Sequence, residues 1–303
     1  MRVFITGAAA CLAKAVLPRL CELQNVESIY GIDLKQCGFT HKKLKSEILD
    51  IRSGRLAEAM IGYDAVVHLA FAVMKGQLTD EEMHENNVHG SLNVFKAAQA
   101  NDIKKVINMS SVSVYGSGEN LTEDAALKPN EVFTYAVHKA EIEREAALHF
   151  PNVTHLRAHL IFGPNAQEFL RSMCKAAYVI TTPRPAQLQV VHEQDVAEAI
   201  VQALHTDATG PFNLAAPEIT TLAALVRDGR KLRVPIPLNA IRQAVKIAKL
   251  MGSKDEYTWL DVMETTLTVR CERAREALQW APHYTAWQAR EAMSGGSSAA
   301  NPA

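Results

Sequence analysis

The sequence predicts an α/β fold in which a doubly wound parallel sheet is followed by a smaller C-terminal lobe. Three observations support this prediction. Short apolar segments alternate with longer amphipathic segments through the first half of the chain, as strands alternate with crossover helices. The first apolar segment runs directly into a turn and then a helix. The regular alternation stops after Pro164.

Apolar spacing predicts each element in the first half of the chain. In the first helix, for example, Leu12, Val16 and Leu20 fall on one face of a 3.6-residue period. Runs of β-branched and apolar residues predict the strands. The predicted strands are residues 3–5, 28–32, 46–49, 65–70, 105–109 and 153–161, and the predicted helices are residues 11–23, 81–100 and 133–149.

The second half is less regular. We predict a helix at 166–177, a strand at 188–191, a helix at 194–205 and a strand at 210–214. Prolines limit residues 232–238 to an extended segment. Residues 241–251 carry an apolar stripe opposite basic residues, which favours a surface helix over a membrane helix.

Composition excludes several classes of function. The 303 residues are 48% hydrophobic and 21% charged, with a net charge of −1, so nothing attracts nucleic acid or a membrane surface in general. We expect no membrane span and no signal peptide. The five cysteines form no C-x-x-C pair, which favours reduced thiols in a cytoplasmic protein. The eleven histidines lack a convincing ligand spacing, so we expect no metal site.

The first turn and the second strand predict a dinucleotide site. Thr6-Gly7 and a run of small residues follow the first strand, and Asp33 ends the second. In a βαβ unit, such a turn faces a phosphate and such an acid accepts hydrogen bonds from the adenosine ribose. The Asp33 carboxylate repels a 2′-phosphate, so NAD is favoured over NADP. Lys35, two residues further on, keeps NADP possible.

A tyrosine and a lysine predict acid–base chemistry. Tyr135 and Lys139 lie four residues apart on a predicted helix and therefore on one face of it. A nearby ammonium favours a phenolate, so we expect the pKa of Tyr135 to fall from about 10 and allow proton transfer at a substrate oxygen. Ser111, after the strand at 105–109, can bind the same oxygen. The spacing alone also fits a surface tyrosine beside a solvated lysine.

The order of motifs resembles the extended short-chain dehydrogenase/reductase family. This family includes NAD-dependent nucleotide-sugar epimerases and dehydratases, as well as reductases of other alcohols and ketones. The resemblance covers residues 1–214, and Leu278-Gln279-Trp280-x-Pro282 resembles a late family motif. The motifs are Thr6-Gly7, Asp33, Asp50-Ile51, His68-Leu69-Ala70, Asn87-Val88, Ser110-Ser111-x-x-Val114-Tyr115-Gly116, Tyr135-x-x-x-Lys139, Arg157, Gly163-Pro164 and Asp195-Val196-Ala197.

The resemblance implies an organisation and a set of roles. Together with the loss of alternation after Pro164, it predicts a Rossmann dinucleotide-binding domain over residues 1–160, with residues 191–214 returning to it, and a substrate lobe over 161–190 and 215–292. The composition of the last residues, rich in Gly, Ser and Ala, predicts a disordered tail over 293–303. Tyr135 is expected to be the general acid/base, Lys139 its tuner and the anchor of the nicotinamide ribose, and Ser111 the group that positions substrate. The expected cofactor-binding residues are Gly7, Ala10, Cys11, Leu12, Asp33, Asp50, Ile51, Leu69, Ala70, Asn87, Tyr135 and Lys139.

Departures from the family pattern bear on cofactor and substrate. The usual glycines of the turn are replaced by Ala10 and Ala13. A methyl at position 10 reduces clearance for a pyrophosphate, and we expect a slightly displaced cofactor before a loss of catalysis. Leu160 stands where nucleotide-sugar enzymes often have Asn, and Leu188-Gln189-Val190 where they often have Arg-Asp-Phe. Without that arginine a diphosphate loses a strong partner, although Arg184 could substitute.

These departures favour one function and leave others open. We expect an NAD(P)-dependent oxidoreductase that acts on a small or apolar alcohol or ketone. A nucleotide-sugar epimerase or dehydratase with the same site remains an alternative, as does a cofactor-binding regulator without catalysis. Helices 81–100 and 133–149 expose more apolar residues than one sheet face needs, so we also expect a homodimer.

Overall fold

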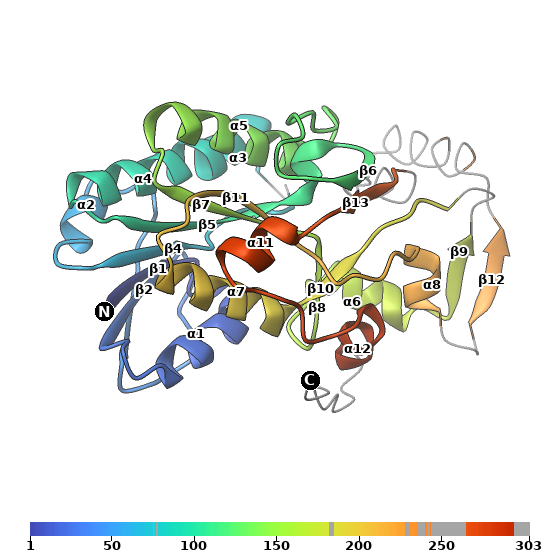
Figure 1. The fold of residues 1–303 in the computed structure, drawn as a ribbon, viewed down its shortest axis with the longest axis horizontal. Helices are drawn as coiled ribbons and strands as arrows, with labels where there is room; N and C mark the ends of the chain where they lie inside the picture. Colours follow the sequence, from blue (N-terminus) through green and yellow to red (C-terminus); the bar gives the residue numbers. More distant parts are fainter. Residues whose placement is uncertain are drawn as a thin grey trace.

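A parallel sheet of seven strands forms the centre of the molecule, in the order β11-β7-β5-β4-β1-β2-β3 (Figure 1). The computed structural model describes residues 1–74, 76, 78–181, 185–227, 231–235, 240, 243 and 265–293. This sheet confirms the predicted fold class. Its strands are β1 (Arg2–Thr6), β2 (Ser28–Asp33), β3 (Leu44–Ile48), β4 (Ala65–His68), β5 (Lys105–Ser111), β7 (Val153–Ala158) and β11 (Gly210–Leu214).

The strand order reverses between β1 and β4. From β1 the chain moves outward through β2 and β3, then returns to pair β4 with the other side of β1. In open parallel sheets, ligands bind beyond the carboxyl ends of the strands at such a reversal. Here those ends carry Thr6 and His68, which pair with each other in the sheet register.

Helices cover both faces of the sheet (Figure 1). One face packs against α1 (Ala13–Glu22) and α7 (Glu193–His205), and the other against α2 (Leu56–Ala59), α4 (Gly90–Ala100) and α5 (Thr134–His149). Alternation along β1 explains the two cores. Val3 and Ile5 belong to the first core, while Phe4 between them belongs to the second.

The predicted helix 81–100 contains a π-helical turn. It consists of α3 (Asp80–His84), the π-helix η1 (Glu85–His89) and α4. A capping box begins it, with the Glu82 amide donating to Thr79 Oγ1 at 3.1 Å and the Thr79 amide donating to Glu82 Oε2 at 2.8 Å. Single π-turns inside helices often occur at functional sites. This one holds Asn87, which is fully buried.

The predicted strand 153–161 divides in two. β7 ends at Ala158, and β8 (Leu160–Phe162) pairs with β10 (Val190–His192) in a separate sheet. His159 lies at the division, where its amide donates to the Leu214 carbonyl at 2.9 Å and its Nδ1 accepts from the Leu160 amide at 2.9 Å. The predicted strand 188–191 corresponds to β10, which pairs with β8 outside the main sheet. Within residues 191–214, β11 is the strand that pairs with the main sheet.

Part of the described chain outside the main sheet surrounds a smaller apolar cluster, while other parts, such as η2 (Val112–Tyr115) and β13 (Leu267–Val269), pack into the first core. That cluster contains Phe162, Leu170, Leu188, Val190 and Leu225. The elements outside the main sheet and its helices are η2, β6 (Gly118–Leu121), α6 (Glu168–Lys175), β9 (Tyr178–Thr181), α8 (Leu222–Val226), β12 (Leu232–Pro235), β13, α11 (Glu272–Ala277) and α12 (Ala286–Ala292).

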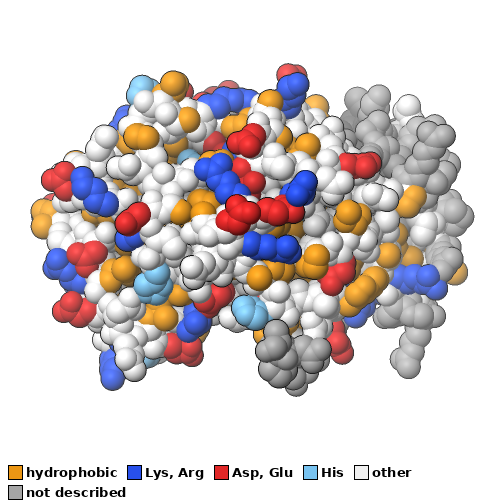
Figure 2. Space-filling model, in the orientation of Figure 1, with side chains coloured by type: hydrophobic (Ala, Val, Ile, Leu, Met, Phe, Trp, Pro, Cys, Tyr) orange, Lys and Arg blue, Asp and Glu red, His pale blue; other side chains and the backbone are white. Residues whose placement is uncertain are grey.

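Some predictions lie outside the described residues. These are Arg184, the predicted helix 241–251 apart from residue 243, residues 236–238 of the extended segment, and the tail beyond residue 293. On the face in Figure 2, acidic and basic side chains of the described chain are intermixed, and neither sign of charge forms a large patch. No helix among the described residues has the length and apolar character needed to cross a membrane.

Candidate active site

The turn after β1 depends on a glycine. Gly7 has a φ of +75°, and a Cβ built on it would lie 2.5 Å from the Ala70 backbone nitrogen. Only a residue without a side chain allows this close approach. The Ala13 methyl is fully buried under the sheet, and Ala10 packs against the same core. The two alanines that replace family glycines therefore both have apolar neighbours.

Asp33 lies beside this turn. Its Oδ2 accepts from the Ala9 amide at 2.9 Å, and its Oδ1 accepts from the Lys35 amide at 3.1 Å. The carboxylate of the second strand is therefore held against the first turn of the βαβ unit. Cys11 and Leu12 complete the turn, and the Cys11 side chain is exposed.

Asp50 and Ile51 have well-defined neighbours. Arg52 holds the Asp50 carboxylate through its guanidinium, with Nη2 2.5 Å from Oδ2, and through its amide at 2.8 Å. These hydrogen bonds keep the pKa of Asp50 below its usual range despite partial burial. The Ile51 side chain fills the space that a Cβ on Gly90 would need, with Cδ1 2.6 Å from that position.

Asn87 fixes the segment that follows β4. Its Oδ1 accepts from the Ala72 amide at 2.8 Å, and its Nδ2 donates to the Ala72 carbonyl at 2.9 Å. The same Nδ2 donates to His138 Nδ1 at 3.3 Å. Further back, the Leu69 amide donates to the Thr6 carbonyl at 3.0 Å. Both ends of the segment from Leu69 to Ala72 are therefore tied to the framework.

The structure brings Ser111, Tyr135 and Lys139 together. Ser111 ends β5, while Tyr135 and Lys139 lie one turn apart on α5. Lys139 Nζ donates to the Met109 carbonyl at 2.6 Å, which joins α5 to the strand that carries Ser111. The same nitrogen lies 5.9 Å from the centre of the Tyr135 ring. The phenol, hydroxyl and ammonium thus share the carboxyl end of β5.

The prediction that the pKa of Tyr135 falls is wrong for the protein without a bound cofactor. Burial raises the pKa of Tyr135 to about 12, and a hydrogen bond with Ser111 opposes this only in part. Burial also lowers the pKa of Lys139 to about 7, against the attraction of Glu143. The helical spacing was interpreted correctly, but the spacing does not reveal how deeply both groups are buried, and here desolvation outweighs their proximity.

Two residues at the site were not predicted. Ser113 Oγ donates to Ser111 Oγ at 2.9 Å, and the Ser113 amide donates to the same oxygen at 3.2 Å. The Phe71 ring lies with its centre 3.5 Å from Lys139 Nζ and meets the Tyr135 ring edge-to-face. Position 113 falls inside the motif that contains Ser111, so proximity could have indicated it. Phe71 offered no comparable signal.

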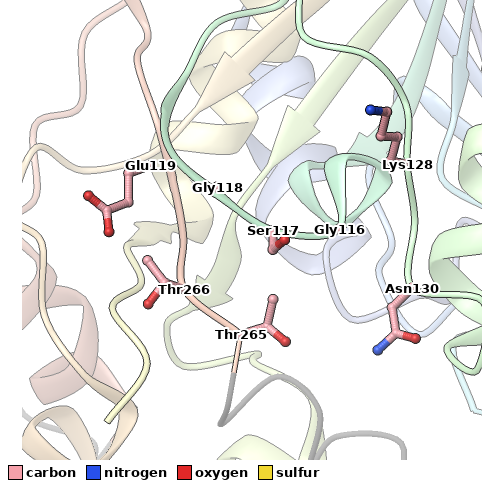
Figure 3. A pocket seen from close by; sticks show the side chains of 8 residues that line it. All are labelled: Gly116, Ser117, Gly118, Glu119, Lys128, Asn130, Thr265 and Thr266. Atoms are coloured by element: carbon pink, nitrogen blue, oxygen red, sulfur yellow. The ribbon is translucent and has the colours of Figure 1, made fainter. Parts of the chain in front are cut away.

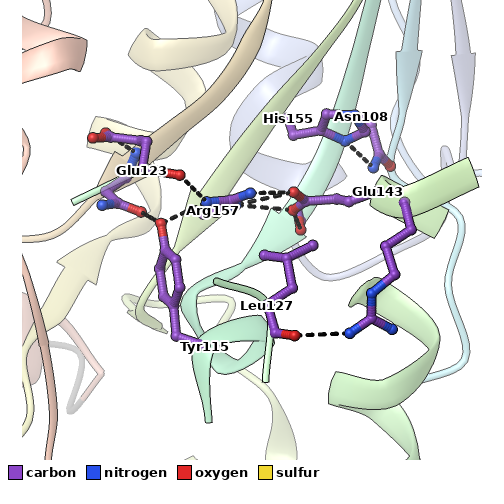
Figure 4. A network of polar contacts seen from close by, with 10 residues as sticks. Asn108, Tyr115, Glu123, Leu127, Glu143, His155 and Arg157 are labelled. Atoms are coloured by element: carbon purple, nitrogen blue, oxygen red, sulfur yellow. Dashed lines mark hydrogen bonds and ion pairs between the residues drawn. The ribbon is translucent and has the colours of Figure 1, made fainter. Parts of the chain in front are cut away.

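A buried ion pair supports the site from behind (Figure 4). Arg157 on β7 and Glu143 on α5 are 4% and 5% exposed, and Arg157 Nη2 lies 2.5 Å from Glu143 Oε2. Ser110 Oγ donates to Glu143 at 2.5 Å, and Arg157 Nη1 donates to the Tyr115 hydroxyl at 2.6 Å. Burial acts to raise the pKa of Glu143, but His155, Arg157 and Ser110 together lower it below its usual range.

A cavity lies beside the segment that follows Tyr115. It measures about 530 Å³, and Figure 3 shows Glu119 across from Lys128 and Asn130. Its lining does not include Ser111, Tyr135 or Lys139, so the cavity is separate from the place where these three side chains meet. Among the described residues, no group of three or more His, Cys, Asp or Glu side chains is placed to hold a metal ion. All five cysteines are free. The cavity is lined by Gly116, Ser117, Gly118, Glu119, Lys128, Asn130, Thr265 and Thr266.

Known sequences show which proteins this chain resembles. Residues 3–215 match the model of the NAD dependent epimerase/dehydratase family. An uncharacterised protein of Mycobacterium tuberculosis is 27% identical over 314 residues, covering 95% of this chain and 81% of that protein. The L-arabinose 1-dehydrogenase (NAD(P)(+)) of Haloferax volcanii is 33% identical over 118 residues, covering 38% of this chain and 42% of that enzyme.

Solved structures share the fold. The UDP-glucose 4-epimerase of Thermotoga maritima, solved with UDP-glucose, has a TM-score of 0.76 at 18% identity and covers 97% of both chains. The dTDP-glucose 4,6-dehydratase of Bacillus anthracis, solved with NAD, has a TM-score of 0.75 at 17% identity and covers 97% of this chain and 95% of its own. These identities bear on the fold alone. The family match spans the β1 turn, Ser111, Tyr135 and Lys139, and it confirms the resemblance, the expected class of enzyme and the NAD dependence of that class. The chain belongs to the NAD dependent epimerase/dehydratase family, a family of enzymes.

Proposed function

We propose that the protein is an NAD(P)-dependent oxidoreductase of the extended short-chain type that acts on a small or apolar alcohol or ketone. The observation that carries this proposal is the position of Ser111, Tyr135 and Lys139 at the carboxyl end of β5, with Lys139 bound to Met109. A phenol and a hydroxyl near one point can bind a substrate oxygen, and a phenol can exchange a proton with it.

The residues at the turn after β1 fit a dinucleotide. Gly7 lets the turn pack directly against the backbone of Leu69 and Ala70 at the sheet reversal, and Asp33 lies beside the turn with carboxylate oxygens that can accept from ribose hydroxyls. We assign adenosine binding to Asp33, Asp50 and Ile51, and the phosphate-facing turn to Gly7 through Leu12. NAD, when bound, supplies the hydride acceptor or donor of the reaction.

The acid–base step follows from the environment of Tyr135. With a pKa near 12, Tyr135 remains a phenol at neutral pH and can donate its proton to a carbonyl oxygen. Ser111 holds that oxygen beside the phenol, and Ser113 orients Ser111 through their 2.9 Å hydrogen bond. Lys139 binds the nicotinamide ribose and, when charged, favours the phenolate that remains after transfer.

Apolar packing supports a small or apolar substrate. Leu188 and Val190, which stand where nucleotide-sugar enzymes often carry Arg and Phe, are 2% and 0% exposed in the smaller cluster. Leu160 packs against the same cluster. These side chains provide no charge for a diphosphate.

A nucleotide-sugar epimerase or dehydratase is the second candidate. It is supported by solved relatives of this fold whose titles name UDP-glucose or dTDP-glucose enzymes. Such enzymes regenerate NAD within one cycle, whereas an oxidoreductase accumulates NADH. Net NADH formation therefore discriminates the two. A non-catalytic regulator would bind NAD but show neither reaction.

Assembly, location and domain division are further parts of the proposal. We propose a homodimer through α4 and α5, supported by Leu148 on α5, which is 73% exposed; sedimentation showing only monomer at micromolar concentration would contradict it.

The free cysteines support a reducing compartment such as the cytoplasm. We also propose a dinucleotide-binding domain of residues 1–160 and 191–214, with 161–190 and 215–292 as the substrate lobe.

Replacement of Tyr135 tests the mechanism. A fluorescence titration with NADH and NADPH comes first, followed by thermal-shift screens of ketones, alcohols and UDP-sugars. Tyr135→Phe keeps the ring but removes the proton donor, so turnover should fall by about 10²–10⁴-fold while NADH binding persists. Tyr178→Phe, an exposed tyrosine on β9, is the matched control and should leave turnover unchanged. Near wild-type turnover of Tyr135→Phe would show that Tyr135 is structural.

A further inference from the structure

Phe71 occupies the space above the Lys139 ammonium. The centre of its ring lies 3.5 Å from Lys139 Nζ, within the range of a cation–π contact. The same ring meets Tyr135 at 5.3 Å between centres and at 82°, the edge-to-face arrangement that aromatic pairs prefer. One side chain thus contacts both groups that we propose for the chemistry.

The ammonium has few directions left for a ligand. An ammonium carries three N–H donors. One donates to the Met109 carbonyl at 2.6 Å, and the face of Phe71 covers the nitrogen from another side. Lys139 as a whole is only 4% exposed. A ribose hydroxyl cannot reach the nitrogen from the side on which the ring lies at this distance.

The backbone around Phe71 is held in place. Asn87 binds both the amide and the carbonyl of Ala72, and the Leu69 amide donates to the Thr6 carbonyl. Movement of the whole segment would break these bonds. Rotation of the Phe71 side chain about its own bonds breaks none of them, and Phe71 itself is only partly buried. Uncovering Lys139 by a change of the Phe71 rotamer therefore leaves these backbone hydrogen bonds intact.

We propose that Phe71 competes with the cofactor for Lys139: its ring covers the ammonium in the free protein and turns aside when the nicotinamide ribose binds. This inference rests on the proposed function, because Lys139 serves as the ribose anchor there. It makes Phe71 a residue that sets cofactor affinity. Because the contact between the Phe71 ring and the Lys139 ammonium must be broken before the cofactor binds, the free energy of that contact is subtracted from the free energy of cofactor binding.

NADH affinity tests this competition. Fluorescence titration should show that Phe71→Ala binds NADH about tenfold more tightly than wild type, which corresponds to about 1.4 kcal/mol. Phe71→Leu keeps much of the apolar bulk without the π face, so its gain should be smaller. Phe133→Ala is the matched control, because the Phe133 ring also lies against Tyr135, at 5.4 Å, and should leave NADH affinity unchanged.

A second variant isolates the role of the ammonium. Lys139→Met removes the group for which ring and ribose compete, so adding Phe71→Ala to Lys139→Met should give no gain in affinity. Labelling with an amine reagent, followed by mass spectrometry, supplies a readout without cofactor. Lys139 should react faster in Phe71→Ala than in wild type, and NADH should protect it.

The possible outcomes distinguish a failure of the Phe71 competition from a failure of the proposed function. If wild type binds NADH but Phe71→Ala binds equally or less tightly, the competition is refuted and the proposed function stands. The same holds if the gain persists in the Lys139→Met background, or if Lys139 labelling is unchanged. If neither wild type nor Phe71→Ala binds NADH or NADPH, the proposed function fails and this inference fails with it.

Discussion

Arg157→Met should destabilise the protein strongly. Arg157 makes three hydrogen bonds to Glu143 within 3.1 Å and also donates to the Tyr115 hydroxyl and the Glu123 carbonyl. Methionine retains apolar length but supplies no donor. The Glu143 carboxylate, in a residue that is 5% exposed, would lose the Arg157 donors and keep the hydrogen bond from Ser110 Oγ. The cost comes chiefly from this stranded carboxylate and much less from the loss of attraction.

The expected magnitude is large for one substitution. Breaking a buried pair by removing one partner costs about 3–5 kcal/mol. With typical urea dependence, the unfolding midpoint should fall by roughly 1–2 M. The matched control is Arg19→Met, because Arg19 pairs with Glu198 at 2.9 Å but is 37% exposed. Such surface pairs contribute about 0–1 kcal/mol. Urea titration followed by tryptophan fluorescence measures both variants.

A second substitution tests the explanation itself. Glu143→Gln removes the charge that Arg157→Met leaves unpaired, so the double variant should be more stable than Arg157→Met alone. Such non-additivity is expected for groups in direct contact. If Arg157→Met costs no more than Arg19→Met, or if Glu143→Gln brings no recovery, the buried network does not stabilise the site as argued here.

Three more predictions concern the turn, a buried histidine and cofactor choice. Gly7→Ala places a Cβ 2.5 Å from the Ala70 nitrogen at a φ of +75°, so it should lower the melting temperature and cost at least about 1–3 kcal/mol, whereas Gly54→Ala, with open space around it, should not. Burial lowers the pKa of His68 from 6.5 to about 3, so between these pH values the unfolded chain binds a proton that the folded protein excludes. The free energy of unfolding should therefore decline as the pH falls from 6.5 toward 3. Urea titrations of His68→Gln at several pH values should show a shallower decline than those of wild type. Asp33→Ala should reduce the preference for NADH over NADPH in fluorescence titrations, and tighter binding of NADPH to wild type would refute the assignment.

Spacing along the chain predicted the parts of the site that depend on local geometry. Tyr135 and Lys139 share a helix, so their separation alone places them one turn apart. Ser111 and Asp33 end strands of one parallel sheet, and parallel strands bring their carboxyl ends to the same edge. The fold class followed from the same regularity of strands and helices.

Tertiary packing decided what the sequence could not show. Arg157 is visible in the sequence only as part of a motif, because its partner Glu143 lies on another element and the pairing requires α5 to pack on the face of the sheet that carries Arg157. Phe71 looked like any apolar residue, and its position over Lys139 depends on how Asn87 holds Ala72. The pKa of Tyr135 was predicted in the wrong direction for a related reason, since burial is a property of the folded molecule.

The position of β11 has a consequence for synthesis on the ribosome. This strand closes one edge of the sheet beside β7, yet its residues, 210–214, follow the whole of α6, β10 and α7 in translation order. Asn213 of β11 also accepts the hydrogen bond of the Tyr115 hydroxyl at 2.7 Å. A nascent chain that has not yet reached residue 214 therefore leaves the edge of β7 unpaired. Residues 1–160 alone should for this reason need protection from aggregation until β11 arrives.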